Sequence, residues 1–178
     1  SDVIPKHLEA ITAKLREVGA LVEVDPEVIR VKGVPDLKPS DLKTFPYPGF
    51  PTDLQPPGMV LLTAAKGLSV ITENVFDGRY NRANDLKRMG ARIKVEGRTA
   101  LIEGGFPLSG APVTAPDLRS RAALIIAATM AEGTSQVSSI EHVDRGYEKF
   151  EEKLIALGAK IKRAKDMNHI NVKDSGKH

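Results

Sequence analysis

Cysteine and tryptophan are absent from the 178-residue chain, and aromatic residues make up only 4% of it. The lack of cysteine excludes disulfides, thiolate metal ligands and a cysteine nucleophile within this chain. Because aromatic side chains are scarce, the hydrophobic core must be aliphatic. The histidines show no spacing typical of a metal site, so we expect no metal and no cofactor; they are His7, His142, His169 and His178.

Long apolar runs and strong charge are also lacking. The longest apolar run, Ala122–Ala128, is far shorter than the roughly 20 residues that a membrane-spanning helix needs. The net charge is only +3, and no basic run is interleaved with aromatic residues, so we expect neither a membrane nor a nucleic-acid partner. No N-terminal signal pattern is visible, and a cytoplasmic protein is the expectation.

Three similar phrases recur along the chain. Each combines an amphipathic helix pattern, a glycine typical of a helix C-terminus and two strand patterns joined by a turn. The phrases span 8–33, 84–104 and 149–174. Their glycines are Gly19, Gly90 and Gly158, about 70 residues apart. This spacing predicts a fold built from repeated units.

A second phrase occurs twice, at 51–76 and 115–143. Each copy has an Asp-Leu pair, a nearly all-apolar helix pattern and then a strand pattern. Such a helix, from about residue 118 to 131 in the second copy, is expected to be buried on almost all sides. In the first copy, Thr52 and Gln55 have the spacing of a capping box at the helix start.

The chain therefore predicts a mixed α/β (α+β) fold of about 70-residue units, with buried helices and strands outside. We expect one domain over 1–178, with a partial unit at 1–45 and complete units at 46–108 and 109–178. Since the first unit lacks a buried helix and strand, we expect an N-terminally truncated domain. The alternative is a first unit that is short by nature, as terminal repeats often are.

Four phrases in order resemble the enolpyruvyl transferases: "FPTDLQ", "ITENVFDGRY", "LSGAPVTAPDLR" and "HVDRGYEKFEEKLIALGA". The resemblance runs over about 3–162 and implies an inside-out α/β barrel. Members have two such barrels with the active site in the cleft between them, and this chain would cover most of the C-terminal one. The missing N-terminal barrel of the same polypeptide is then its partner, and that barrel carries the general acid.

The resemblance also implies a reaction. Members of the branch with these phrases transfer the enolpyruvyl group of phosphoenolpyruvate to the 3′-hydroxyl of UDP-N-acetylglucosamine, the first committed step of bacterial peptidoglycan synthesis. This chain alone would be inactive. The alternative is a non-catalytic binding or assembly module that retains the barrel.

Asp53 is the one carboxylate in "PYPGFPTDLQPPG" (46–58), a stretch with five prolines. Proline fixes φ, so this stretch is expected to hold its aspartate in place. The resemblance assigns Asp53 to the substrate hydroxyl, as general base and substrate contact. The alternative is an aspartate that stabilises a helix start.

Asp117 and Arg119 belong to the "DLR" phrase, which opens the second apolar helix. The resemblance implies that Asp117 handles protons in the cleft and that Arg119 joins a charged cluster there. The alternatives are a helix cap and an ordinary exposed arginine. Arg121 departs from the family pattern, and it must reach solvent, find a partner or mark a shifted helix face.

Val75, Arg79 and Arg145 complete the expected substrate contacts. The resemblance implies that the backbone of Val75 contacts the nucleotide sugar; the alternative is a core strand residue. Arg79 and Arg145 occupy matching places in two repeats, and a guanidinium suits phosphate and carboxylate. The resemblance assigns Arg145 to phosphoenolpyruvate, and its alternative is an ion pair with Asp144 or Glu148.

Overall fold

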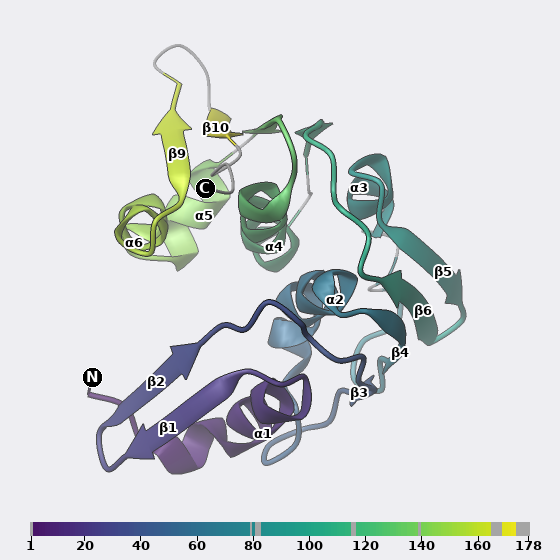
Figure 1. Ribbon diagram of the computed structural model, residues 1–178, viewed down its shortest axis with the longest axis vertical. Helices are drawn as coiled ribbons and strands as arrows, with labels where there is room; N and C mark the ends of the chain where they lie inside the picture. Colours follow the sequence, from purple (N-terminus) through teal and green to yellow (C-terminus); the bar gives the residue numbers. More distant parts are fainter. Residues whose placement is uncertain are drawn as a thin grey trace. The chain divides into compact units, whose positions relative to one another are not determined.

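The computed structural model describes residues 2–78, 80, 83–114, 117–138, 140–164 and 169–173. These residues form two compact units, Ser1–Tyr80 with Arg92–Phe106 and Asn81–Ala91 with Pro107–His178 (Figure 1). The single-domain organisation and the repeat boundaries stay predictions. Among the described residues, no helix is long and apolar enough to cross a membrane.

The first unit contains two helical regions, one at its N-terminus and one between the first and second strands of its central sheet. The helices are η1 (Pro5–Leu8), α1 (Glu9–Glu17), η2 (Thr52–Leu54) and α2 (Gln55–Ala64). The strands are β1 (Leu21–Asp25), β2 (Val28–Lys32), β3 (Leu42–Lys43), β4 (Gly67–Thr72), β5 (Arg92–Glu96) and β6 (Thr99–Gly104). The strands β1 and β2 form an antiparallel two-stranded sheet, and the others form a four-stranded sheet in the order β3-β4-β6-β5.

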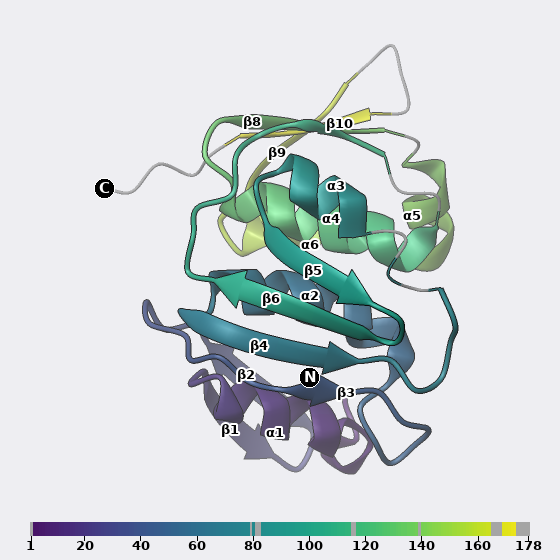
Figure 2. The same ribbon diagram turned by 90° about the vertical axis from the view of Figure 1, so that its right-hand side faces the viewer.

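The core of the first unit lies between α2 and its four-stranded sheet. Figure 2 shows β5, β6 and β4 side by side with α2 behind them. Several aliphatic side chains of α2 and the sheet are almost fully buried, namely Val60, Leu62, Ile71, Ala100 and Ile102. This close packing fixes α2 against the sheet, and the loops that follow α2 and β4 start from the same core.

The second unit repeats this arrangement. Its helices are α3 (Ala83–Arg88), α4 (Leu118–Met130), α5 (Glu141–Gly146) and α6 (Phe150–Ala156), and its strands are β7 (Pro112–Val113), β8 (Thr134–Ser138), β9 (Lys160–Arg163) and β10 (His169–Lys173). The sheet has the order β7-β8-β10-β9. In both four-stranded sheets the first strand runs parallel to the second and the other neighbours are antiparallel.

Several expectations of local structure are confirmed. Gly19, Gly90 and Gly158 have φ of 100°, 90° and 98°, the left-handed conformation that ends a helix without a Cβ clash. The predicted apolar helix appears as α4, which is buried along most of its length. Arg121 lies within it with only 2% of its surface exposed, so this side chain does not reach solvent.

The predicted capping box is wrong, because Thr52 is not the N-cap residue of a helix. The N-cap residues of η2 and α2 are Pro51 and Leu54, and neither makes a side-chain capping hydrogen bond. The hydroxyl of Thr52 donates to Glu73, a residue 21 positions further along the chain. The Thr52 hydroxyl, which the local spacing assigned to a helix cap, therefore binds the distant Glu73 instead.

Candidate functional site

The proline-rich loop before α2 is closed by its own backbone. The N–H of Phe45 donates to the carbonyl of Phe50 at 3.0 Å, and the N–H of Gly49 donates to that of Pro46 at 2.8 Å. A Cβ on Gly49 would lie 2.5 Å from the Cβ of Phe45, so the turn is tight enough to require glycine. Asp53 follows in η2, with an exposed side chain. The stretch therefore presents one carboxylate to solvent from a stiff loop.

Glu73, just past the end of β4, links the proline-rich loop to the loop that follows β4. Its side chain is 1% exposed. Oε2 accepts a hydrogen bond from the Thr52 hydroxyl at 3.0 Å, and Oε1 accepts one from the Thr44 hydroxyl at 2.7 Å. Oε1 also accepts the backbone N–H groups of Val75 at 2.9 Å and Phe76 at 3.0 Å. One buried carboxylate thus contacts the Asp53 turn and the Val75 loop.

Val75 lies beyond β4 and is 39% exposed, so its reading as a core strand residue is wrong. The rest of its loop is held by neighbours. The guanidinium of Arg98 pairs with Asp77, and the buried Tyr80 donates its hydroxyl to the carbonyl of Ile71 at 2.8 Å. Burial raises the pKa of Tyr80, which keeps this hydroxyl a donor. The contact of Val75 with a substrate stays a prediction.

Asp117 caps α4 in the second unit. Its Oδ1 accepts the backbone N–H groups of Arg119 at 3.1 Å and Ser120 at 3.2 Å. The reading of Asp117 as a helix cap is therefore confirmed, because these are donors that the first turn leaves unsatisfied. Asp117 and Arg119 are both half-buried. A role of either side chain toward a substrate stays a prediction.

Arg145 lies in the last turn of α5 and is exposed. The next residue, Gly146, faces Leu118: a Cβ on Gly146 would lie 2.3 Å from Leu118 Cδ2. The end of α5 is therefore close against the start of α4. This contact brings the segment of Arg145 beside the segment that carries Asp117 and Arg119.

The carboxylate next to Arg145 is occupied by another arginine. Arg163 of β9 donates to both oxygens of Asp144, at 2.8 and 3.0 Å, and to Glu151 of α6 at 3.1 Å. The hydrogen bonds from Arg163 hold the pKa of Asp144 below its usual range. Glu148, the other expected partner, pairs with Lys153. Within the part of the chain that the structure describes, Asp144 and Glu148 therefore pair with Arg163 and Lys153, and neither pairs with Arg145.

The structure brings the predicted residues together in two groups. Asp53 and Val75 are joined through Glu73 in the first unit, and Asp117, Arg119 and Arg145 are neighbours in the second. Arg79 lies outside the described residues. Sequence reasoning missed Glu73 and Arg163. The signal for Glu73 was a carboxylate directly after an apolar strand, while the "KIKR" of Arg163 gave no signal beyond a basic strand.

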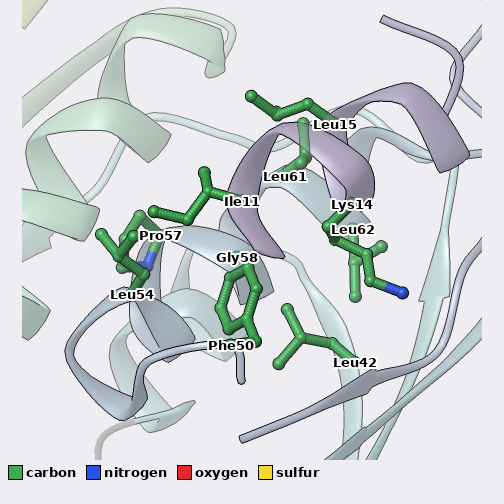
Figure 3. A pocket seen from close by; sticks show the side chains of 10 residues that line it. All are labelled: Ile11, Lys14, Leu15, Leu42, Phe50, Leu54, Pro57, Gly58, Leu61 and Leu62. Carbon is green, nitrogen blue, oxygen red and sulfur yellow. The ribbon is translucent and has the colours of Figure 1, made fainter. Parts of the chain in front are cut away.

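A separate cavity of about 220 Å³ in the first unit lies between α1 and α2 (Figure 3). Its walls are aliphatic apart from Phe50 and Lys14. The amine of Lys14 is already bound to Glu17 and Ser40. A phosphorylated or carboxylated substrate would find no polar group to bind there, so the cavity is not part of the candidate site.

Solved structures with this architecture define the class of fold. The enolpyruvyl transferase NikO from Streptomyces tendae matches 88% of this chain with a TM-score of 0.80 and 28% identity, over 36% of its own length. EPSP synthase from Acinetobacter baumannii matches 95% of the chain with a TM-score of 0.75 at 24% identity, over 39% of its length. The chain therefore has the enolpyruvyl transferase fold, as predicted.

The family follows from sequence. Residues 1–154 match the model of the EPSP synthase (3-phosphoshikimate 1-carboxyvinyltransferase) family, and the chain belongs to this family. A relative from Caldanaerobacter subterraneus named UDP-N-acetylglucosamine 1-carboxyvinyltransferase 3 is 55% identical over 92% of the chain and 39% of its own length. Relatives with this enzyme name from Bacillus subtilis and Desulfofundulus thermocisternus are 52% and 53% identical, over 38% and 67% of their lengths. The chain spans about two fifths of the length of most of these relatives.

Proposed function

We propose that this chain is the C-terminal part of an enzyme that transfers the enolpyruvyl group of phosphoenolpyruvate to the 3′-hydroxyl of UDP-N-acetylglucosamine. The observation that carries the proposal is the presentation of Asp53. Its carboxylate is exposed on a proline-stiffened turn, and that turn is fixed by a buried glutamate to the loop of Val75. The names of the relatives support the choice of substrates.

The proposed step needs a base at this place. When the sugar hydroxyl attacks C2 of phosphoenolpyruvate, a C–O bond forms and the hydroxyl proton must leave. Asp53 accepts that proton. In the later elimination, phosphate leaves C2 and a proton leaves the neighbouring methyl carbon, which together restore the enol double bond. A carboxylate serves this purpose only within hydrogen-bond reach of the hydroxyl, so a stiff turn favours the reaction. Protonation of the methylene carbon requires an acid outside this chain.

The remaining predicted residues bind substrate in this proposal. Arg145 holds phosphoenolpyruvate, because a guanidinium gives two parallel hydrogen bonds to a carboxylate or phosphate. Arg119 and Asp117 lie beside it in the second unit, and Arg79 supplies a second guanidinium. The backbone of Val75 contacts the nucleotide sugar. No metal or cofactor takes part.

The test is the Asp53→Ala variant of the full-length gene product. Steady-state phosphate release with both substrates should show kcat reduced by about 10²–10⁴-fold, the usual contribution of a general base. Affinity for the nucleotide sugar should change much less. The control is Asp36→Ala, which removes an exposed carboxylate of the same unit paired with the exposed Lys66. An unchanged kcat in Asp53→Ala, or wild-type protein without phosphate release, refutes the proposal.

A further inference from the structure

Glu73 is a buried carboxylate to which the reaction proposed above assigns neither a proton transfer nor a substrate contact. Only 1% of its surface is exposed, and a charge in such a place is costly unless it is well hydrogen-bonded. Four donors surround it: two hydroxyls and two backbone N–H groups, all between 2.7 and 3.0 Å. Its oxygens are therefore well satisfied, and removing the side chain would strand four donors.

The four donors come from three segments: two lie 29 and 21 residues before Glu73, and the third follows it by two and three residues. Thr44 directly follows β3, Thr52 begins the η2 turn that contains Asp53, and Val75 and Phe76 form the loop after β4. Glu73 itself is fixed by its backbone, since its N–H donates to the carbonyl of Arg98 at 2.9 Å. Thr44 adds a second link, because its hydroxyl accepts the N–H of Asn74 at 3.0 Å.

The two carboxylate oxygens of Glu73 bind different segments. Oε2 binds the Thr52 hydroxyl, which is one residue from Asp53, while Oε1 binds the N–H of Val75 and of Phe76. The turn with the base and the loop with the expected sugar contact are thus set by the same side chain. A shift of about 1 Å at a reacting group can lower a rate about 100-fold, so a common anchor for both segments has a direct effect on rate.

We propose that Glu73 is a positioning residue that fixes the Asp53 turn and the Val75–Phe76 loop relative to each other, so that the nucleotide sugar and the base meet in one geometry. This inference rests on the proposed function. Glu73 acts through Thr52 on Asp53 and through two backbone amides on the loop, and it does not touch the substrate. We call the hydrogen bond to Thr52 the first arm of this anchor and the hydrogen bonds to the Val75 and Phe76 amides the second arm. The two arms should affect the kinetics differently, because the first places the base and the second places the sugar contact.

The first arm is tested by Thr52→Val and Thr52→Ser in the full-length enzyme. Valine keeps the shape of threonine and removes the hydroxyl, so the link to Oε2 is lost. We expect kcat to fall about 10–100-fold while KM for UDP-N-acetylglucosamine stays within about threefold. Serine retains the hydroxyl and should restore kcat to within a few fold of wild type. A merely structural threonine would not produce this split or this rescue.

The second arm is tested by Glu73→Ala, which should raise KM for the nucleotide sugar as well as lower kcat. Hydrogen exchange of the peptide 73–78 gives a readout that needs no activity. Loss of the carboxylate should speed exchange of the Val75 and Phe76 amides by about tenfold or more, since each loses its acceptor. The matched control is Glu103→Ala, an exposed glutamate of β6 in the same unit, which should change neither kinetics nor this exchange.

The outcomes separate the two proposals. Wild-type enzyme that fails to transfer the enolpyruvyl group refutes the proposed function, whatever the variants do. An active wild type whose Thr52→Val variant keeps its kcat refutes the positioning role alone, and so does a serine variant that fails to restore a lost kcat. If Glu73→Ala does not fold, the Thr52 pair still decides the question. Unchanged exchange at 73–78 in a folded Glu73→Ala variant also overturns the inference.

Discussion

Gly104 is the position where one added methyl group should disturb the core most directly. It ends β6 and is buried, and a Cβ there would lie 2.2 Å from the carbonyl oxygen of Ala65 and 2.3 Å from that of Leu62. Cβ atoms are essentially never found closer than 3.0 Å to such neighbours, so the backbone at the end of α2 must move by at least 0.8 Å. The movement also strains the hydrogen bond from Gly105 N–H to the Thr63 carbonyl, now 2.9 Å.

The magnitude follows from overpacking. Extra atoms in a well-packed core typically cost about 1–3 kcal/mol, and the upper part of that range applies because both obstacles are backbone atoms. We expect Gly104→Ala to lower the free energy of unfolding by about 2–3 kcal/mol. At about 2–4 °C per kcal/mol for a chain of this size, the melting temperature should fall by about 4–12 °C.

The assay is urea and thermal unfolding of Gly104→Ala beside Gly33→Ala. No atom lies within 4 Å of the place that an alanine methyl would take at Gly33, and φ there is not positive. Alanine at this control position should therefore be neutral or stabilising by up to about 1 kcal/mol. A Gly104→Ala variant as stable as wild type would refute the close approach of α2 to β6. Equal losses in both variants would refute the steric explanation.

Two further predictions concern the second unit. Arg145→Lys should lower kcat/KM for phosphoenolpyruvate by about 10–100-fold, because a lysine cannot make the paired hydrogen bonds of a guanidinium. The affinity for the nucleotide sugar and the melting temperature should stay near those of the wild type. A lowered melting temperature with normal kinetics would contradict this. Asp144→Asn should cost about 0.2–1 kcal/mol at pH 7, since the pair with Arg163 is 45% and 41% exposed. Because folding lowers the pKa of Asp144, this contribution is complete above its ordinary value near 3.8 and is lost as the pH falls through the lower folded value. The difference between the two proteins in urea unfolding should therefore be smaller at pH 2 than at pH 7.

Sequence patterns gave reliable guidance where structure is local. The glycines at 19, 90 and 158 mark helix ends because positive φ is a property of one residue and its neighbours. The helix α4 and the hairpin of β5 and β6 follow from apolar spacing and from one turn. In contrast, β3 and β7 have only two residues each, and such strands exist only because a neighbour pairs with them.

The candidate site was predictable only in part for the same reason. Asp53, Asp117 and Arg145 stand in distinctive phrases, whereas the groups that hold them are set by folding. Thr52 has the spacing of a capping residue, and nothing in its surroundings indicates that a glutamate 21 residues away takes its hydroxyl. Arg163 pairs with Asp144 from a strand 19 residues away. Long-range partners of this kind are visible only when the chain is folded.

The two-stranded sheet of the first unit has a consequence for handling this chain in solution. The strands β6 and β10 of the two larger sheets are paired on both sides, whereas within the described part of the chain β2 is paired with β1 alone. Leu21, Val24 and Val31 on this hairpin are each more than 40% exposed. An unpaired strand edge beside exposed aliphatic side chains is a template for another strand, and charged neighbours oppose that pairing only while they are unscreened. Preparations of the 178-residue chain should therefore self-associate through the hairpin of β1 and β2 as protein concentration and salt rise.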